Sequence, residues 1–327
     1  MHTLAEEIRK TAARLLAEGT VDVVIGHAKG TVPLRSTVLF ARDAAAAGRL
    51  VFDVTCGANL ARYLLKERLA LKKGQQTKPE KIALIAKGCD GRAAVQLIVE
   101  GRISREDVVI VGLSCPGVLD PSKLRRKLAG KGVLAWKAEG DALLLKGQDF
   151  EQDVPLKDVL SDSCLRCRHP VPPVCDVLIG DPAQVAPPDS ESSTAEDLEQ
   201  RTPDERWAFF EREFSKCIRC YACRNACPIC YCRDCFIDQN DPQWFGKSTD
   251  LADTVAFHVV RAMHTAGRCV DCGACERACP MGVRLRALNG RAEKEVRERF
   301  GYEAGMSLDE APALATFRED DPQEFIL

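Results

Sequence analysis

Hydrophobic and polar positions alternate with two different periods in the first half of the chain. Short aliphatic runs predict buried strands at residues 21–25, 49–54, 81–87, 107–113 and 142–146. Residues 58–74 and 91–101 place apolar side chains three and four positions apart, which indicates helices. Residues 1–19 share this helical spacing and lack the pattern of a signal peptide, so we expect a surface helix there. Strands that alternate with helices predict an α/β domain with a partly parallel sheet.

The second half of the chain follows a different pattern. Residues 180–203 are rich in proline, serine and acidic side chains and show no apolar period, which is typical of a linker. Helical spacing returns at residues 207–217 and 254–269, and each of these segments leads directly into a cysteine cluster. We therefore expect an α/β domain at residues 1–181, a linker at 182–203 and a mainly α-helical domain at 204–327.

Composition narrows the class of protein. The 327 residues carry a net charge of only −2 and no long basic run, so we expect no nucleic-acid partner. No apolar run approaches the roughly 18 residues of a membrane-spanning helix, so we expect no direct membrane insertion. The chain has 17 cysteines. Cytoplasmic thiols stay reduced, so a cytoplasmic location and metal binding explain them better than disulfides do.

Two copies of one cysteine motif stand in the C-terminal third. Each has the spacing C-x2-C-x2-C-x3-C and is followed by proline, which is typical of paired 4Fe-4S clusters. Three cysteines of a motif hold one cluster and the fourth reaches the other cluster. The predicted ligand sets are Cys217, Cys220, Cys223 and Cys279 for one cluster, and Cys269, Cys272, Cys275 and Cys227 for the other. Zinc is the alternative metal, but it would leave the third-loop cysteine and the proline without a role.

Residues 228–268 separate the two motifs, and helices are predicted within this gap. In this respect the region resembles the helical dicluster ferredoxin domains of heterodisulfide-reductase and succinate-dehydrogenase iron-sulfur subunits. Three more cysteines, Cys230, Cys232 and Cys235, follow the first motif and have no place in that pattern. They could supply a further cluster together with an N-terminal cysteine, replace one of the predicted ligands, or pack as small apolar side chains.

The N-terminal domain has its own cysteines at the ends of predicted strands. Cys56, Cys89 and Cys115 follow such strands, and Cys164, Cys167 and Cys175 come later. Loops after parallel strands are where open α/β sheets bind ligands, so a third 4Fe-4S cluster is possible here. The basic side chains near the strand ends, His27, Lys29 and Lys87, are expected to be solvated rather than to bind a cofactor.

Four short stretches carry a second resemblance: AKGCDGRAAVQL, VGLSC, the C-x2-C pair at 164–167, and DVLIGD. In their order they resemble the beta subunits of deazaflavin-reducing hydrogenases and of related formate dehydrogenases. The resemblance implies one 4Fe-4S cluster beside a flavin adenine dinucleotide (FAD). The cluster ligands that it implies are Cys56, Cys115, Cys164 and Cys167, with Cys175 or Cys89 in reserve. The family domain continues well beyond DVLIGD, whereas here a linker begins, and no G-x-G-x-x-G follows a strand.

These patterns predict an iron-sulfur electron-transfer subunit of a cytoplasmic oxidoreductase complex, with no catalytic residue of its own. By resemblance, its partners would be a heterodisulfide-reductase-type flavoprotein, a hydrogenase or a formate dehydrogenase, in an anaerobic metabolism. The alternative is a flavin-containing oxidoreductase that itself reduces or oxidises a deazaflavin, a nicotinamide or another small acceptor.

Overall fold

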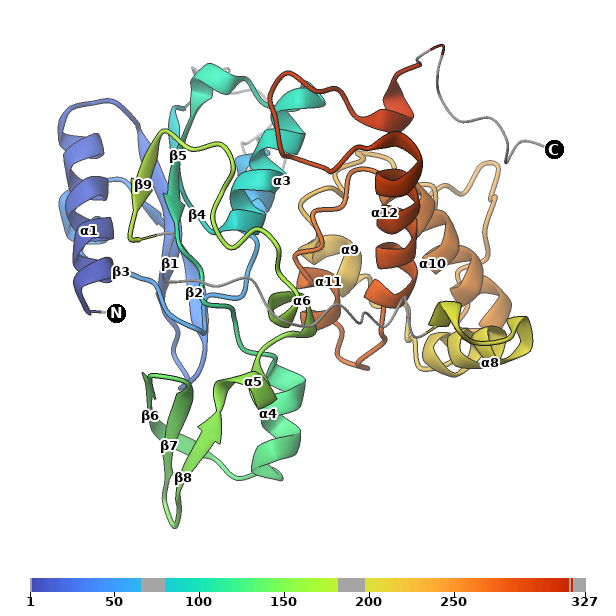
Figure 1. Cartoon of the computed structure of the whole chain (residues 1–327), viewed down its shortest axis with the longest axis horizontal. Helices are drawn as coiled ribbons and strands as arrows, with labels where there is room; N and C mark the ends of the chain where they lie inside the picture. The colour runs from blue at the N-terminus through green and yellow to red at the C-terminus, as the bar shows by residue number, and fades with distance from the viewer. Residues whose placement is uncertain (1, 66–79, 182–197, 318, 320–327) are drawn as a thin grey trace.

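The N-terminal part is built around a mixed, mostly parallel sheet (Figure 1). The computed structural model describes residues 2–65, 80–181, 198–317 and 319. Strands β1 (Val23–Lys29), β4 (Ile82–Ala86), β5 (Val108–Leu113) and β9 (Val177–Ile179) are parallel. Strands β2 (Ser36–Ala41) and β3 (Leu50–Val51) pair with β1 in the antiparallel sense. The order across the sheet is β2-β1-β4-β5-β9.

Helices cover both faces of this sheet (Figure 1). Helices α1 (His2–Ala17) and α2 (Ala44–Ala47) lie on one face, and α3 (Gly88–Val99) and the 3-10 helix η1 (Leu60–Leu64) lie on the other. Strand β4 is fully buried: Leu84 packs into the core beneath α3, and its neighbour Ile85 packs into the core beneath α1. Burial on both faces is why this strand reads as a continuous apolar run.

A small lobe is inserted between β5 and β9. It consists of an antiparallel sheet of β6 (Val133–Glu139), β7 (Ala142–Gly147) and β8 (Glu151–Pro155), with α4 (Pro121–Leu128) and α5 (Leu156–Val159) packed against it. The short helix α6 (Asp162–Leu165) follows and carries Cys164. The lobe therefore ends directly at the first cysteine of the C-x2-C pair.

The C-terminal part is helical. Its helices are α8 (Pro203–Phe214), α9 (Ala222–Ala226), α10 (Leu251–Thr265), α11 (Ala274–Arg277) and α12 (Arg286–Phe300). Helix α10 packs against α8 and α12, and the two short helices that follow the cysteine loops, α9 and α11, pack against each other. Among the described helices, none is both long enough and apolar enough to cross a membrane.

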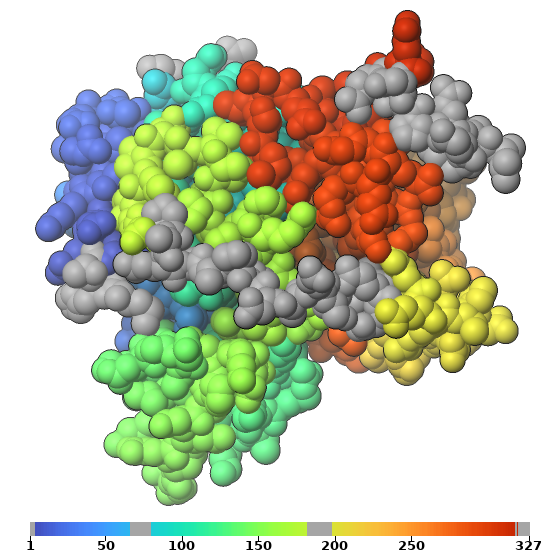
Figure 2. Space-filling view, viewed as in Figure 1, coloured from blue at the N-terminus to red at the C-terminus, as the bar shows by residue number. Residues whose placement is uncertain are grey.

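The two parts lie directly against each other (Figure 2). Ile229, Val296 and Tyr302 of the C-terminal part belong to the same hydrophobic core as Leu97 of α3. Around this core, Arg92 of α3 donates two hydrogen bonds, of 3.0 and 2.8 Å, to the carbonyl oxygen of Ala304. The shared core fixes the C-terminal cysteine loops relative to the parallel sheet.

The predicted fold class is confirmed in both parts, and the five predicted strand regions overlap β1, β3, β4, β5 and β7. Of the predicted helix at 58–74, the described residues contain only the turn η1, and residues 66–79 lie outside them. The predicted linker lies mostly outside the described residues, and α8 begins at Pro203. The domain boundaries therefore stay a prediction.

Candidate metal centres

The two cysteine motifs adopt the same backbone conformation. In the first loop Arg219 and Tyr221 have positive φ angles of 55° and 58°, and in the second loop Asp271 and Gly273, at the equivalent positions, have 49° and 67°. Left-handed residues turn the backbone amides inward. The amide of Arg219 donates to Cys217 Sγ and that of Asp271 donates to Cys269 Sγ, both at 3.4 Å. In both loops a backbone N–H group therefore donates to the first cysteine of the motif, an interaction that also tunes bound iron-sulfur clusters.

The thiols group across the two motifs. Cys217 and Cys223 of the first motif each interact electrostatically with Cys279, the last cysteine of the second motif. Conversely, Cys269, Cys272 and Cys275 each interact with Cys227, the last cysteine of the first. This is the crossed arrangement that the spacing predicts, and ligation itself stays a prediction. Cys220 is exposed, so the first group reaches the molecular surface.

A third group of cysteines lines a partly open cavity of about 170 Å³ at the carboxyl ends of β4 and β5. Four N-terminal cysteines line this cavity: Cys89, Cys115, Cys164 and Cys167. Cys272 of the second cysteine loop also lines it, so the cavity adjoins the second group. Four thiols around one small cavity suit a cubane cluster. Among the described residues, no three histidine, cysteine or acidic side chains lie close enough together to hold a single metal ion.

Local packing brings these four cysteines together. Cys89 lies in the first turn of α3. The chain just after the C-x2-C pair passes so close to this turn that a Cβ atom at Gly88 would collide with the carbonyl oxygen of His169. Cys164 follows Ser163, whose hydroxyl donates to the carbonyl oxygen of Cys272 at 3.3 Å. Gly88 thus allows the close approach between α3 and the segment after the C-x2-C pair, and Ser163 connects the third cysteine group to the second.

The other predicted N-terminal ligands lie elsewhere. Cys56 is buried in the core beneath α1, where its Sγ accepts from the Asp53 amide at 3.4 Å. Cys175 packs against Gly112 of β5. Neither residue lines the 170 Å³ cavity, whereas the reserve candidate Cys89 does. The structure therefore favours Cys89 in place of Cys56.

The three additional cysteines have three different environments. Cys230 is half-buried, and its thiol donates a hydrogen bond to Cys227. Cys232 is exposed, and Cys235 accepts a hydrogen bond from Arg224. Of the alternatives from the sequence, packing therefore describes Cys230 best, with the addition of a direct contact to a predicted ligand.

His27 and Lys87 are buried rather than solvated, so the expectation for these two side chains was wrong. Lys87 Nζ lies 2.7 Å from the Asp90 carboxylate and 3.5 Å from His27 Nε2. Burial alone would lower the pKa of Lys87, but the charge of Asp90 outweighs it and raises that pKa. Burial and the nearby Lys87 charge lower the pKa of His27. Because Lys87 also lines the 170 Å³ cavity, it places a fixed positive charge beside the third group.

Burial is the main influence on the thiols. It raises the pKa of Cys115 and of Cys56 to about 12, and it also raises the pKa of Cys89, Cys269 and Cys272. Cys227 is an exception, because the hydrogen bond from Cys230 lowers its pKa to about 5. Neutral thiols must lose their protons to bind iron, so binding of clusters would release protons.

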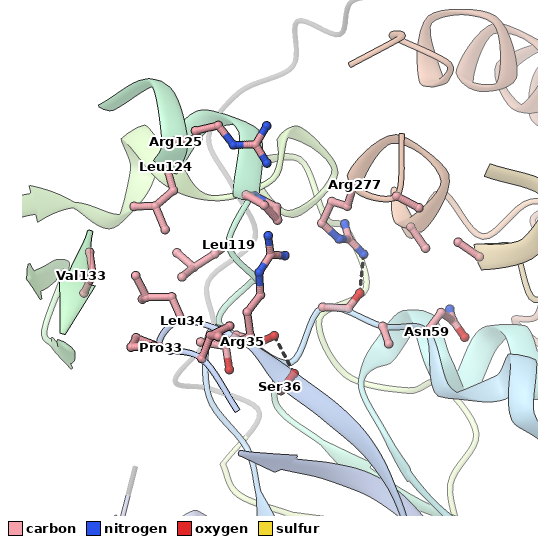
Figure 3. Close-up of a pocket in the computed structure, with 18 of the residues that line it drawn as sticks. Pro33, Leu34, Arg35, Ser36, Asn59, Leu119, Leu124, Arg125, Val133 and Arg277 are labelled. Carbon is pink, nitrogen blue, oxygen red and sulfur yellow. Dashed lines mark hydrogen bonds between the residues drawn. The ribbon is translucent and has the colours of Figure 1, made fainter. Parts of the chain in front are cut away.

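A second, larger cavity of about 600 Å³ opens where three parts of the chain meet (Figure 3). Its walls come from the segments before β2 and around η1, from α4 of the small lobe, and from α9 and α11 beside the cysteine loops. Five of its described lining residues are cationic and none is acidic; the cations are Arg35, Arg62, Arg125, Lys131 and Arg277. Apolar side chains such as Leu119, Leu124 and Val133 line the lobe side.

Arg277 connects the two cavities. It lines both of them, and its guanidinium donates to the carbonyl oxygen of Gly57 at 2.9 Å and to Ser161 Oγ at 3.1 Å. No feature of the sequence marked this residue, because its role depends on contacts that span more than a hundred positions.

The two cysteine motifs of the C-terminal part are those of an iron-sulfur protein. Residues 213–283 match the family model described as a 4Fe-4S dicluster domain. The chain thus contains an electron-transfer domain of this type, and the predicted resemblance in its C-terminal part is confirmed.

Two curated relatives cover most of the chain. It is 25% identical, over an alignment 360 positions long, to the F420-dependent formate dehydrogenase 1 subunit beta of Methanococcus maripaludis, covering 92% of this chain and 90% of that protein. It is 23% identical to the F420-dependent formate dehydrogenase subunit beta of Methanocaldococcus jannaschii, covering 69% of this chain and 74% of that one. The predicted resemblance to beta subunits of formate dehydrogenases is confirmed.

Among solved structures, a chain of the F420-reducing [NiFe] hydrogenase complex from Methanosarcina barkeri is similar, with a TM-score of 0.35 and 18% identity. The match covers 50% of this chain and 62% of that chain.

Proposed function

We propose that this chain is the electron-transfer subunit of a cytoplasmic oxidoreductase complex and that it holds three 4Fe-4S clusters in series. The observation that carries this proposal is the continuity of the three cysteine groups. The first group reaches the surface at Cys220, the second shares α9 and α11 with it, and the third adjoins the second through Cys272. Such a series links the protein surface to the edge of the parallel sheet.

A bound 4Fe-4S cluster supplies one-electron oxidation and reduction. The chain would hold the clusters through Cys217, Cys220, Cys223 and Cys279; through Cys269, Cys272, Cys275 and Cys227; and through Cys89, Cys115, Cys164 and Cys167. Backbone amides that donate to Cys217, Cys269, Cys164 and Cys279, each at 3.4 Å, would stabilise added negative charge. The shared hydrophobic core keeps the three sites at fixed separations.

The names of the relatives support the choice of partner. Both are beta subunits of F420-dependent formate dehydrogenases, and the similarity covers most of this chain. We infer that this chain works beside another redox subunit, such as a formate dehydrogenase, a hydrogenase or a heterodisulfide-reductase-type flavoprotein, in an anaerobic metabolism.

A second candidate function, as a flavin-containing oxidoreductase, is favoured by the 600 Å³ cavity. Its volume lies within the range of about 300–1,000 Å³ that is typical of ligand pockets. Cations on several walls suit the phosphates of FAD, and the apolar side suits a flat ring system. Arg277 places this cavity next to the third cysteine group, so a flavin there would exchange electrons with the series.

Anaerobic analysis of iron, acid-labile sulfide and flavin in the purified chain tests both proposals. We expect about twelve irons per chain, and electron paramagnetic resonance signals of interacting clusters after reduction with dithionite. About eight irons would remove the third cluster, and zinc in place of iron would refute the proposal. Stoichiometric flavin would support the second function.

A further inference from the structure

Arg261 lies between the two cysteine groups of the dicluster domain. It is on α10, is only 3% exposed, and its Nη2 donates to the carbonyl oxygen of Cys223 at 3.5 Å. Cys223 belongs to the first group. On the other side, the same guanidinium interacts with Cys227 and Cys275 of the second group.

The charge of Arg261 has no carboxylate partner among the described residues. Arg286 lies 2.5 Å from the Asp271 carboxylate and Arg92 lies 3.2 Å from the Glu303 carboxylate. The buried Arg219 is like Arg261 in having no carboxylate partner among the described residues, but its guanidinium donates to the carbonyl oxygens of Asp253 and Gly246. Nε of Arg261 also lacks a hydrogen-bond partner. A buried, unpaired cation is costly. The groups that face Arg261 are the thiols of Cys223, Cys227, Cys230 and Cys275. Three of them, Cys223, Cys227 and Cys275, are predicted ligands, and as metal-bound thiolates they would balance the charge of Arg261.

We propose that Arg261 is a shared electrostatic control that raises the reduction potentials of both clusters in the dicluster domain. Reduction adds one negative charge to a cluster that its thiolates already make anionic. A fixed positive charge stabilises the reduced form more than the oxidised form, and low-dielectric surroundings strengthen the effect. Because one guanidinium faces both groups, its removal shifts both potentials in the same direction.

The inference rests on the two clusters of the proposed function, and the test begins by counting iron in the wild-type protein. A wild-type chain with fewer than about eight irons refutes the proposed function itself. With the iron present, the midpoint potentials of the wild type, Arg261→Met, Arg261→Gln and Arg261→Lys are measured by anaerobic redox titration followed by electron paramagnetic resonance.

We expect the uncharged variants to favour the oxidised form of both clusters at least tenfold, which is about 59 mV per one-electron couple. Arg261→Lys retains the charge and should stay within a few-fold of wild type. Arg224→Gln is the matched control, because Arg224 lies next to Cys223 but is partly exposed and pairs with Asp238 at 2.7 Å. Its charge is already compensated, so its removal should have a much smaller effect.

Unchanged potentials in Arg261→Met and Arg261→Gln, or a shift no larger than that of Arg224→Gln, would overturn the proposal. Loss of iron in both uncharged variants while Arg261→Lys retains it would show that the charge holds the clusters in place rather than sets their potentials, and it would overturn the proposal. Loss of iron in all three variants would show a purely structural role and overturn it.

Discussion

At the level of single residues, backbone conformation explains why the two cysteine loops are alike in structure but not in sequence. Tyr221 and Gly273 occupy equivalent left-handed positions. Only Gly273 faces the N-terminal part, where a Cβ atom would collide with Ser163. The second loop therefore needs a glycine where the first tolerates a tyrosine.

Gly273→Ala should consequently destabilise the protein by more than backbone strain alone. Gly301 offers a matched control, because it has a similar φ of 63° and nothing lies within 4 Å of an added Cβ. We expect Gly301→Ala to cost about 1 kcal/mol and Gly273→Ala roughly 2–4 kcal/mol, since it adds a collision in a packed interface. Anaerobic thermal unfolding of both variants measures the difference, and equal losses would contradict this explanation.

The placement of Cys89 makes a second prediction about single residues. Cys89→Ser should lose about four of the twelve irons, because Cys89 lines the 170 Å³ cavity. Cys56→Ser removes a thiol that lies in the core beneath α1, so it should keep its iron even where stability falls. The iron content of the two purified variants decides between them. Iron loss in Cys56→Ser alone would restore the ligand set implied by the family resemblance.

The sequence predicted the C-terminal groups because ligand spacing along one chain segment is a local property. It did not distinguish Cys56 from Cys89, since both follow predicted strands. Which cysteine reaches the cavity depends on the face of the sheet that each loop approaches: Cys56 lies beneath α1, and Cys89 begins α3 on the opposite face. Arg277 and Arg261 carry no local pattern at all.

At the level of elements, the segment after α12 connects the helical part to the sheet. Glu303 has hydrogen-bonding or ionic partners in two N-terminal elements: Arg92 of α3 at 3.2 Å, and Arg168 and His169 of the cysteine segment at 2.7 and 2.9 Å. Burial would raise the pKa of Glu303, but these partners outweigh it and lower that pKa to about 2. The ionised carboxylate therefore stabilises the contact between the two parts.

Glu303→Gln should thus destabilise the protein at neutral pH, by roughly 2 kcal/mol. A folded-state pKa below the ordinary value of 4.5 means that the stabilisation is complete above about pH 4.5 and is lost as the pH falls toward 2. Unfolding of wild type and variant at neutral pH and at about pH 3 measures whether their difference shrinks in acid. Glu298→Gln, at a more exposed glutamate on α12, should have little effect at either pH.

The elements that were not predicted from the sequence share a weak pattern of apolar positions. Strand β6 alternates poorly, because most of its side chains are exposed or half-buried at the edge of the small lobe. Helix α12 buries only Ala287, Asn289 and Val296, so its charged face obscures the helical period. In contrast, β4 and β5 are buried on both faces and were predicted nearly to the residue.

At the level of the whole molecule, the chain arranges its sites around the contact between the two parts. The third cysteine group and the cationic cavity both use residues of the sheet, the small lobe or its connections, and the second cysteine loop. The four cysteines of the third group all belong to the N-terminal part, but Cys272 and Arg277 of the C-terminal part complete the wall of their cavity. Sequence patterns that assign residues to separate domains could not predict these contacts between the two parts.

Side chains of the small lobe line the cationic cavity, so we expect substitutions there to change flavin binding and to leave the cysteines of the dicluster domain unaffected. Arg125 of α4 lines the cationic cavity, whereas the adjacent Arg126 points away from it, toward a separate surface pocket with Lys123 and Lys127. Arg125→Glu and Arg126→Glu change the net charge equally. If FAD phosphates bind in the cavity, only Arg125→Glu should weaken FAD binding, by at least tenfold, because it places a carboxylate beside them. Fluorescence titration of flavin-free protein with FAD measures this. Equal affinities in the two variants would show that flavin does not bind in the cationic cavity.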